Sequence, residues 1–213
     1  ALAVFLTMNP DARAGGEPDR VAVVVGSNRA IAGRRALRYA HEDARNMAAV
    51  LRELCGFDRE NVHVVLDPDP DDLLELLENQ AQRLESRGGE SLLLFYYSGH
   101  GIQIGGENFL LPVELEAKSE RTIRYGSINI AEIIDEMERR AAINIVILDA
   151  CRNNPFRTRM VRSSGTRSVG RGLVREAAAR NTLIAYAAAA GETAEDGAGE
   201  HSPYTKALIS HLS

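Results

Sequence analysis

Two unbroken apolar runs limit what this chain can fold into, and each is followed at once by a residue with nucleophilic or acid-base chemistry. Residues 91–97 lead into Ser-Gly-His-Gly at 98–101, and residues 144–148 lead into Asp-Ala-Cys-Arg at 149–152. Such runs are typical of parallel strands buried on both faces, and ligands bind at the carboxyl ends of these strands. If the two strands are neighbours, His100 and Cys151 meet at one edge of a sheet.

The remainder of the chain alternates strand and helix patterns, which predicts an α/β fold. We expect a mostly parallel central sheet with helices on both of its faces. The expected strands and helices, with a β-hairpin at 102–111, follow from hydrophobic periodicity and from turn residues. The strands are expected at 21–26, 61–66, 91–97, 144–148 and 181–187, and the helices at 43–54, 72–85, 130–140 and 204–212.

A cysteine next to a histidine indicates acyl-transfer chemistry. Thiolate is the nucleophilic form of cysteine, and a neighbouring imidazole can take the thiol proton and later return it to a leaving amine. Gly99 and Gly101 flank the histidine, where a missing side chain lets a substrate backbone approach and leaves backbone N–H groups to face an oxyanion. We expect the amides of Gly101 and Cys151 to form that oxyanion hole. The alternative is a buried structural cysteine and a histidine in a glycine turn.

The two motifs resemble those of a known family. Tyr-Ser-Gly-His-Gly at 97–101 and Leu-Asp-Ala-Cys-Arg at 148–152 are similar to the histidine and cysteine motifs of the caspase superfamily, particularly its bacterial metacaspase-like and paracaspase-like (orthocaspase) branch. The resemblance implies a caspase-like three-layer sandwich and a cysteine endopeptidase with a Cys-His dyad, acting on peptide or protein substrates as a monomer or weak dimer. Further similar segments lie at 21–28, 37–47, 182–187 and 202–205.

Asp149, two positions before the cysteine, bears on substrate choice. The resemblance implies an acidic residue here in metacaspases and paracaspases, whereas caspases that cut after aspartate carry glutamine here and arginines around it. A carboxylate in a partly desolvated pocket favours a cationic side chain and repels an anionic one. We therefore predict cleavage after Arg or Lys.

Two further acids are candidates for the same pocket. Asp43 stands where the resembling branch carries a second pocket acid, and Asp196 is a third candidate, for which Glu192 and Glu195 are competitors. A helix N-cap is the alternative role for Asp43, because aspartate is common at that position. Arg38 is the nearby residue that would reverse the charge preference.

An arginine-rich stretch with Ser and Gly occupies residues 157–180. Such a polar, basic segment is poor core material and a good protease substrate. The resemblance makes it the linker between a large-subunit-like part (20–156) and a small-subunit-like part (181–213) of one peptidase domain (20–213). An enzyme that cuts after arginine would process itself here, and the alternative is a solvated loop that is never cut. The expected sites are Arg162, Arg167 and Arg171.

Two other functions fit parts of the same sequence. Cys151, Arg157 and Thr158 have the Cys-x5-Arg-Ser/Thr spacing of cysteine phosphatases, in which loop amides and an arginine cradle a phosphate. Pro155 removes one donor from that cradle, and His100 would have no part in it. The second alternative is a catalytically silent caspase-like scaffold or regulatory domain.

Charge and composition bear on which partners, disulfides, metals and cofactors the protein could have. The net charge of −5 gives no reason to expect a nucleic-acid partner. Two cysteines do not make a disulfide framework, and we expect Cys55 to be a packing residue. We place no metal ligands among the five histidines and the acid-rich turn, and we expect no cofactor. The resemblance implies calcium activation in some relatives only.

Residues 1–19 are expected to form an N-terminal extension. Residues 1–6 are apolar, and Ala-Arg-Ala at 12–14 fits the small-x-small cleavage pattern of a secretory signal peptide. If residues 1–14 are the remnant of such a signal, the protein is secreted or periplasmic, and otherwise it is cytoplasmic. No segment approaches the roughly 18 apolar residues that a membrane-spanning helix needs.

Overall fold

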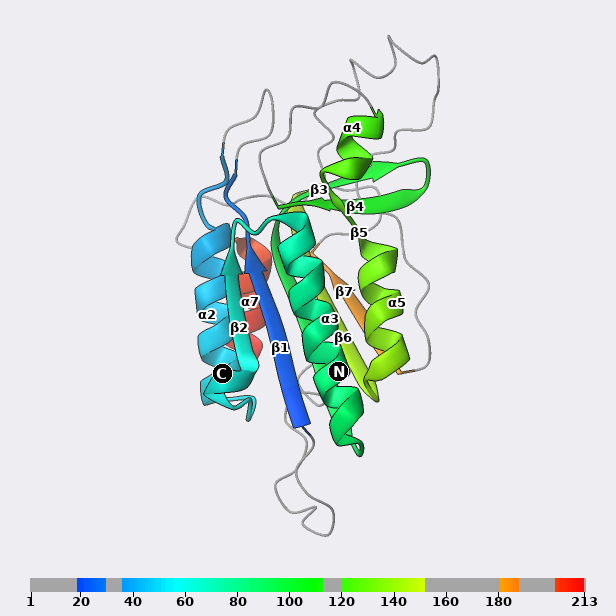
Figure 1. Cartoon of the computed structure of the whole chain (residues 1–213). Coiled ribbons are helices and arrows are strands. Elements are labelled where there is room, and N and C mark those ends of the chain that lie inside the picture. Colours follow the sequence, from blue (N-terminus) through cyan, green and yellow to red (C-terminus); the bar gives the residue numbers. More distant parts are fainter. Residues whose placement is uncertain (1–18, 30–35, 113–119, 152–180, 188–201, 213) are drawn as a thin grey trace.

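The computed structural model describes residues 19–29, 36–112, 120–151, 181–187 and 202–212, with Cys151 described by its backbone alone. Within these residues, helices cover both faces of a seven-stranded sheet (Figure 1). The strands are β1 (Asp19–Gly26), β2 (Val62–Leu66), β3 (Ser91–Ile104), β4 (Glu107–Leu111), β5 (Ile128–Asn129), β6 (Ile143–Cys151) and β7 (Thr182–Tyr186). The helices are α2 (Ala40–Glu53), the short 3₁₀ helix η1 (Arg59–Asn61), α3 (Pro70–Arg87), α4 (Glu120–Tyr125), α5 (Ile130–Arg140) and α7 (Pro203–Leu212).

The centre of the sheet is parallel, as predicted. Strands β2, β1, β3, β6 and β7 lie side by side in that order with parallel pairing. Successive side chains of a strand point to opposite faces, so Val21 and Val23 pack in the core under α3 and α5, whereas Ala22 and Val24 pack under α2 and α7. The predicted α/β class and three-layer sandwich are therefore confirmed.

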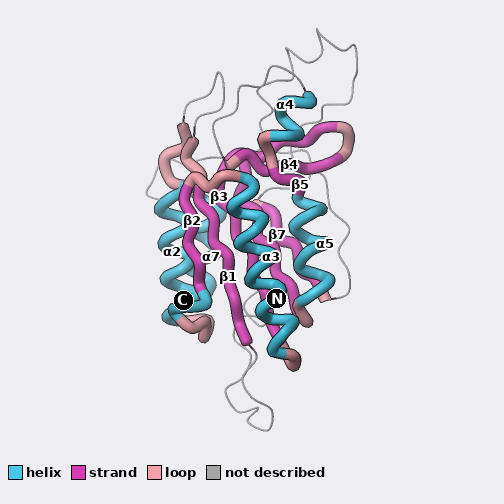
Figure 2. Tube along the Cα trace, viewed as in Figure 1, coloured by secondary structure: helices cyan, strands magenta, loops and turns pink. Residues whose placement is uncertain are grey.

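The apolar run at 91–97 predicts that strand β3 ends before the histidine motif. In the structure the strand continues through that motif to Ile104. Its last residues pair antiparallel with β4, from His100 opposite Leu111 to Ile104 opposite Glu107. Gly105 and Gly106, with φ of 62° and 91°, form the two-residue turn, which favours glycine because no Cβ clashes at positive φ. The predicted hairpin is confirmed, but it begins at the histidine. Figure 2 shows it at the edge of the sheet where the parallel strands end.

The predicted helices are present, with boundaries shifted by up to a few residues. The side chain of Asp69 caps α3 by accepting a hydrogen bond from the Asp71 N–H at 3.0 Å. Asn129 caps α5 in the same way, accepting from the Ala131 N–H at 3.0 Å. These caps satisfy backbone donors that have no partner inside the helix.

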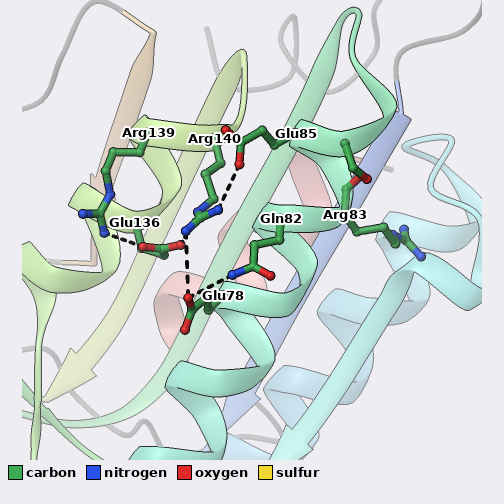
Figure 3. Close-up of polar contacts among 8 residues, drawn as sticks. Glu78, Gln82, Arg83, Glu85, Glu136, Arg139 and Arg140 are labelled. Atoms are coloured by element: carbon green, nitrogen blue, oxygen red, sulfur yellow. Dashed lines mark hydrogen bonds and ion pairs between the residues drawn. The ribbon is translucent and has the colours of Figure 1, made fainter.

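Helices α3 and α5 lie side by side and are joined by ion pairs on their outer surface (Figure 3). The Arg140 guanidinium lies 2.9 Å from the Glu85 carboxylate and 3.8 Å from that of Glu78, both on α3, and 2.6 Å from that of Glu136 on its own helix. Such exposed pairs are screened by water and salt, so the packed apolar faces beneath them hold the two helices to the sheet.

Two short elements, α4 and β5, have no counterpart in the predicted series. Strand β5 consists of two residues that pair with Phe109 and Leu110 of β4. Arg124 of α4 donates to Glu107 of β4 at 2.5 Å. Both elements contact the hairpin, and contacts between segments that are apart in the sequence cannot be predicted from a local sequence pattern.

Candidate active site

The two predicted motifs lie side by side on neighbouring strands. Strands β3 and β6 pair in parallel, with Ser98 opposite Asp149 and His100 opposite Cys151. Because paired strands are separated by about 4.8 Å, the backbones of His100 and Cys151 are direct neighbours. Cys151 lies in β6 rather than after it, since β3 continues to offer backbone partners as far as His100.

His100 lies in the interior of the sheet, between β6 and β4, and the residue is 3% exposed. The Tyr97 hydroxyl donates a hydrogen bond to the His100 carbonyl at 3.0 Å. A Cβ atom at Gly99 would lie only 2.5 Å from that hydroxyl oxygen. The lack of a side chain at Gly99 therefore serves the packing of Tyr97, in addition to any approach of substrate. Gly101, the other flanking glycine, is paired with Leu110 of the hairpin.

Asp43 is fully buried, in the first turn of α2. Tyr39 occupies the N-cap position of this helix, so the alternative N-cap role for Asp43 is wrong; the helix begins three residues earlier than predicted. Both carboxylate oxygens of Asp43 accept from the Ser202 N–H, at 3.3 Å each, and the Ser98 hydroxyl lies 3.5 Å from one of them. The side chain of Asp43 thus faces β3 and the start of α7.

Asp149 is 5% exposed and is held by the same segment. Its Oδ2 accepts hydrogen bonds from the Thr205 hydroxyl, at 2.8 Å, and from the Ser202 hydroxyl. Because Ser202 also contacts Asp43, the structure brings together two of the three predicted pocket acids. The third, Asp196, lies outside the described residues, as does the predicted linker at 157–180.

Two tyrosines border this acidic cluster. The Tyr96 hydroxyl lies 2.6 Å from that of Thr205, and burial, with the negative charges of Asp149 and Asp43, raises the pKa of Tyr96 well above its usual value. Burial, with the charge of Asp149, raises the pKa of Tyr204 to about 12. Both phenols therefore stay protonated at neutral pH and add no negative charge to the cluster.

Sequence reasoning noted the segments that carry Ser98, Ser202 and Thr205 but gave these hydroxyl residues no role in the site. All three are buried, at 4%, 5% and 0% exposure. Ser202 followed by Pro203 is a helix-start signal, since serine is a favoured N-cap and proline a favoured first residue. That signal predicts where α7 begins, but the identity of the groups that α7 contacts depends on tertiary packing.

Asp67 organises the loop that borders the site at the end of β1. Its backbone is in the left-handed region, with φ of 47°, a conformation that aspartate tolerates better than most residues. Its carboxylate accepts from the Asn28 N–H at 3.0 Å and lies 3.0 Å from Nε2 of His41. The Ser27 N–H in turn donates to the Ser98 carbonyl at 2.8 Å, which ties this loop to the histidine strand.

Two other expectations concern single residues, Cys55 and Arg38. Cys55 is buried, as predicted for a packing residue, and burial raises the pKa of its thiol. Arg38 is exposed, and its guanidinium lies 5.4 Å from the centre of the Tyr39 ring. Among the described residues, no three His, Cys, Asp or Glu side chains gather into a metal site, and no helix has the length and apolar character to span a bilayer.

Comparison with known proteins gives the family. The model of the caspase domain matches residues 19–213, which is nearly the whole chain and includes both motifs. A comparison with curated proteins returns no match. The caspase-domain match agrees with the three-layer architecture and with the pairing of the histidine and cysteine strands. The chain therefore belongs to the caspase-domain family of cysteine-type peptidases.

Proposed function

We propose that this protein is a cysteine endopeptidase that cleaves peptide bonds after Arg or Lys, with Cys151 as nucleophile and His100 as general base and acid. The observation that carries the proposal is the direct pairing of His100 with Cys151, two positions after the buried carboxylate of Asp149. Family membership supports the peptidase class over the cysteine-phosphatase alternative.

The reaction proceeds through an acyl-enzyme. His100 takes the thiol proton, and the Cys151 thiolate attacks the scissile carbonyl carbon, so that the carbonyl π pair moves onto oxygen. The amides of Gly101 and Cys151 stabilise this oxyanion. The His100 imidazolium protonates the leaving amine as the C–N bond breaks, which leaves a thioester. Water then attacks the thioester carbon, with His100 accepting its proton, and the C–S bond breaks to release the acid and restore the cysteine.

The buried acids set the preference for a cationic side chain. Asp43 and Asp149 come from different elements, α2 and β6, and both contact Ser202. Two carboxylates in a desolvated site attract a guanidinium or ammonium group and repel an aspartate side chain. The same charge argument disfavours the Asp-specific caspase alternative.

A panel of fluorogenic peptides that differ only in the residue before the cleaved bond tests the proposal. We expect hydrolysis after Arg and Lys, at least about a hundredfold faster than after Asp. An electrophilic trap that ends in Arg should add its mass to a peptide containing Cys151. Preference for Asp would overturn the pocket assignment. Absence of both cleavage and labelling over a wide range of pH and calcium concentration would instead establish the catalytically silent scaffold.

The same specificity predicts self-processing in the arginine-rich segment at 157–180, with Arg162, Arg167 and Arg171 as the expected sites. We expect purified wild-type protein to give fragments with new carboxyl-terminal arginines, and the Cys151→Ala variant to stay intact, by intact-mass spectrometry. Mixing the variant with active enzyme separates cleavage between molecules from cleavage within one. Wild-type protein that stays uncut, and differs from the variant only by the mass of the one sulfur atom lost from Cys151, would contradict self-processing without touching the peptidase assignment.

A further inference from the structure

The start of α7 is hydrogen-bonded to the two buried acids, Asp43 and Asp149. Ser202 caps this helix, since its hydroxyl oxygen accepts from the Thr205 N–H at 3.0 Å and its carbonyl accepts from the Lys206 N–H at 3.0 Å. The same residue donates from its backbone to Asp43 and from its hydroxyl to Asp149. Every polar group of Ser202 is therefore used either to begin the helix or to hold a carboxylate.

The directions of these hydrogen bonds follow from proton counting. Thr205 has a single hydroxyl proton, which it donates to Oδ2 of Asp149. The Thr205 oxygen must then accept from the Tyr96 hydroxyl, 2.6 Å away, which stays protonated. Ser202 likewise gives its hydroxyl proton to Asp149. Two hydroxyl protons from α7 and its cap thus converge on one oxygen, Oδ2 of Asp149.

We infer that Ser202 and Thr205 are positioning residues of the pocket for the basic side chain, fixing the orientation and the ionised form of Asp149. The inference rests on the proposed preference for Arg and Lys. Hydrogen bonds donated to a carboxylate favour its charged form, and a buried charge without such donors is costly. The docking of α7, which follows the linker in the chain, therefore sets how strongly the pocket attracts a cation.

The test compares two peptide substrates with Arg or its neutral isostere citrulline before the cleaved bond. The ratio of their kcat/KM values measures charge discrimination alone. Thr205→Val keeps the shape of the side chain but removes the donor to Asp149, and we expect the Arg-to-citrulline ratio to fall by about tenfold, as for one hydrogen bond to a charged group. The lower ratio should arise from a higher KM for the Arg peptide, with kcat little changed. Thr205→Ser restores the hydroxyl and should restore the ratio.

A matched control separates this effect from general loss of stability. Ser91 is also buried, and its hydroxyl oxygen accepts from the Ala142 N–H at 3.0 Å, at the opposite end of β3. Ser91→Ala removes a buried hydroxyl there, so it should lower the melting temperature without changing the Arg-to-citrulline ratio. If Thr205→Val does not fold, Ser202→Gly replaces it, since glycine is an adequate N-cap and keeps the backbone donor to Asp43.

The outcomes distinguish this inference from the proposed function. If wild-type protein prefers Arg but folded Thr205→Val or Ser202→Gly keeps the wild-type ratio, the positioning role is wrong and the peptidase stands. An equal fall in the ratio with Ser91→Ala would also overturn the inference, because loss of stability alone would then explain the change. If wild-type protein does not discriminate Arg from citrulline, the proposed specificity itself fails.

Discussion

Replacement of Cys151 by alanine should lower kcat/KM for an Arg-ending peptide by at least about a thousandfold, because the variant has no group to form the thioester. The fold should persist, since the pairing of residue 151 with His100 uses the backbone of β6 and not its side chain. Hydrolysis of a fluorogenic peptide, read beside a thermal melt of the same sample, measures both quantities.

A companion experiment replaces the histidine. His100→Gln removes the base while keeping a polar side chain of similar length in a buried position. If sulfur and imidazole act as one unit, the double variant should be about as inactive as the worse single variant, and the two losses should not multiply. Losses that multiply fully would show that the two residues do not act as one unit, and activity retained in folded Cys151→Ala would show that Cys151 is not the nucleophile.

Conversion of Asp149 to asparagine should remove most of the preference for a basic residue. We expect kcat/KM for the Arg peptide to fall by about a hundredfold or more, as when one member of a buried charge pair is truncated, while the citrulline peptide changes little. Asparagine is nearly isosteric, and its carbonyl oxygen can still accept from Ser202 and Thr205, so the packing of α7 should survive.

The control for this second variant is a change of the same kind far from the site. Asp135 is exposed on α5, on the face of the sheet opposite Asp43 and Ser202. Asp135→Asn alters the net charge by the same amount and should leave the Arg-to-citrulline ratio at its wild-type value. An unchanged ratio in folded Asp149→Asn would refute the assignment of Asp149 to the pocket, whatever the nucleophile.

The strands and helices could be predicted because their signals are local. The apolar run before the histidine predicts a buried strand, and Gly105 with Gly106 predicts the turn that follows. The strand ends could not be predicted in the same way. Strand β3 continues through His100 because β6 and then β4 supply backbone partners, and no residue within 98–101 carries that information.

In the candidate site, too, local sequence signals predicted some features and tertiary packing decided others. The expectation that His100 and Cys151 meet depends on two buried strands being neighbours, with their carboxyl ends at the edge where ligands bind; the parallel pairing of β3 with β6 meets that condition. Asp43 was ambiguous between a helix cap and a pocket acid, because aspartate suits both places. The structure excludes the cap, since α2 begins at Ala40, and it turns Asp43 toward Ser202, which is far away in the sequence.

By itself, the sequence determined the α/β class, the order of the longer elements and the chemistry available at two strand ends, because apolar periodicity and residue type act over a few neighbours. The tertiary structure alone decided that Ser202 and Thr205 hold Asp149, and that Gly99 makes room for Tyr97. These contacts join segments whose meeting depends on the folding of the whole sheet. The hydrogen bonds of a buried carboxylate are chosen from whatever donors that folding brings near.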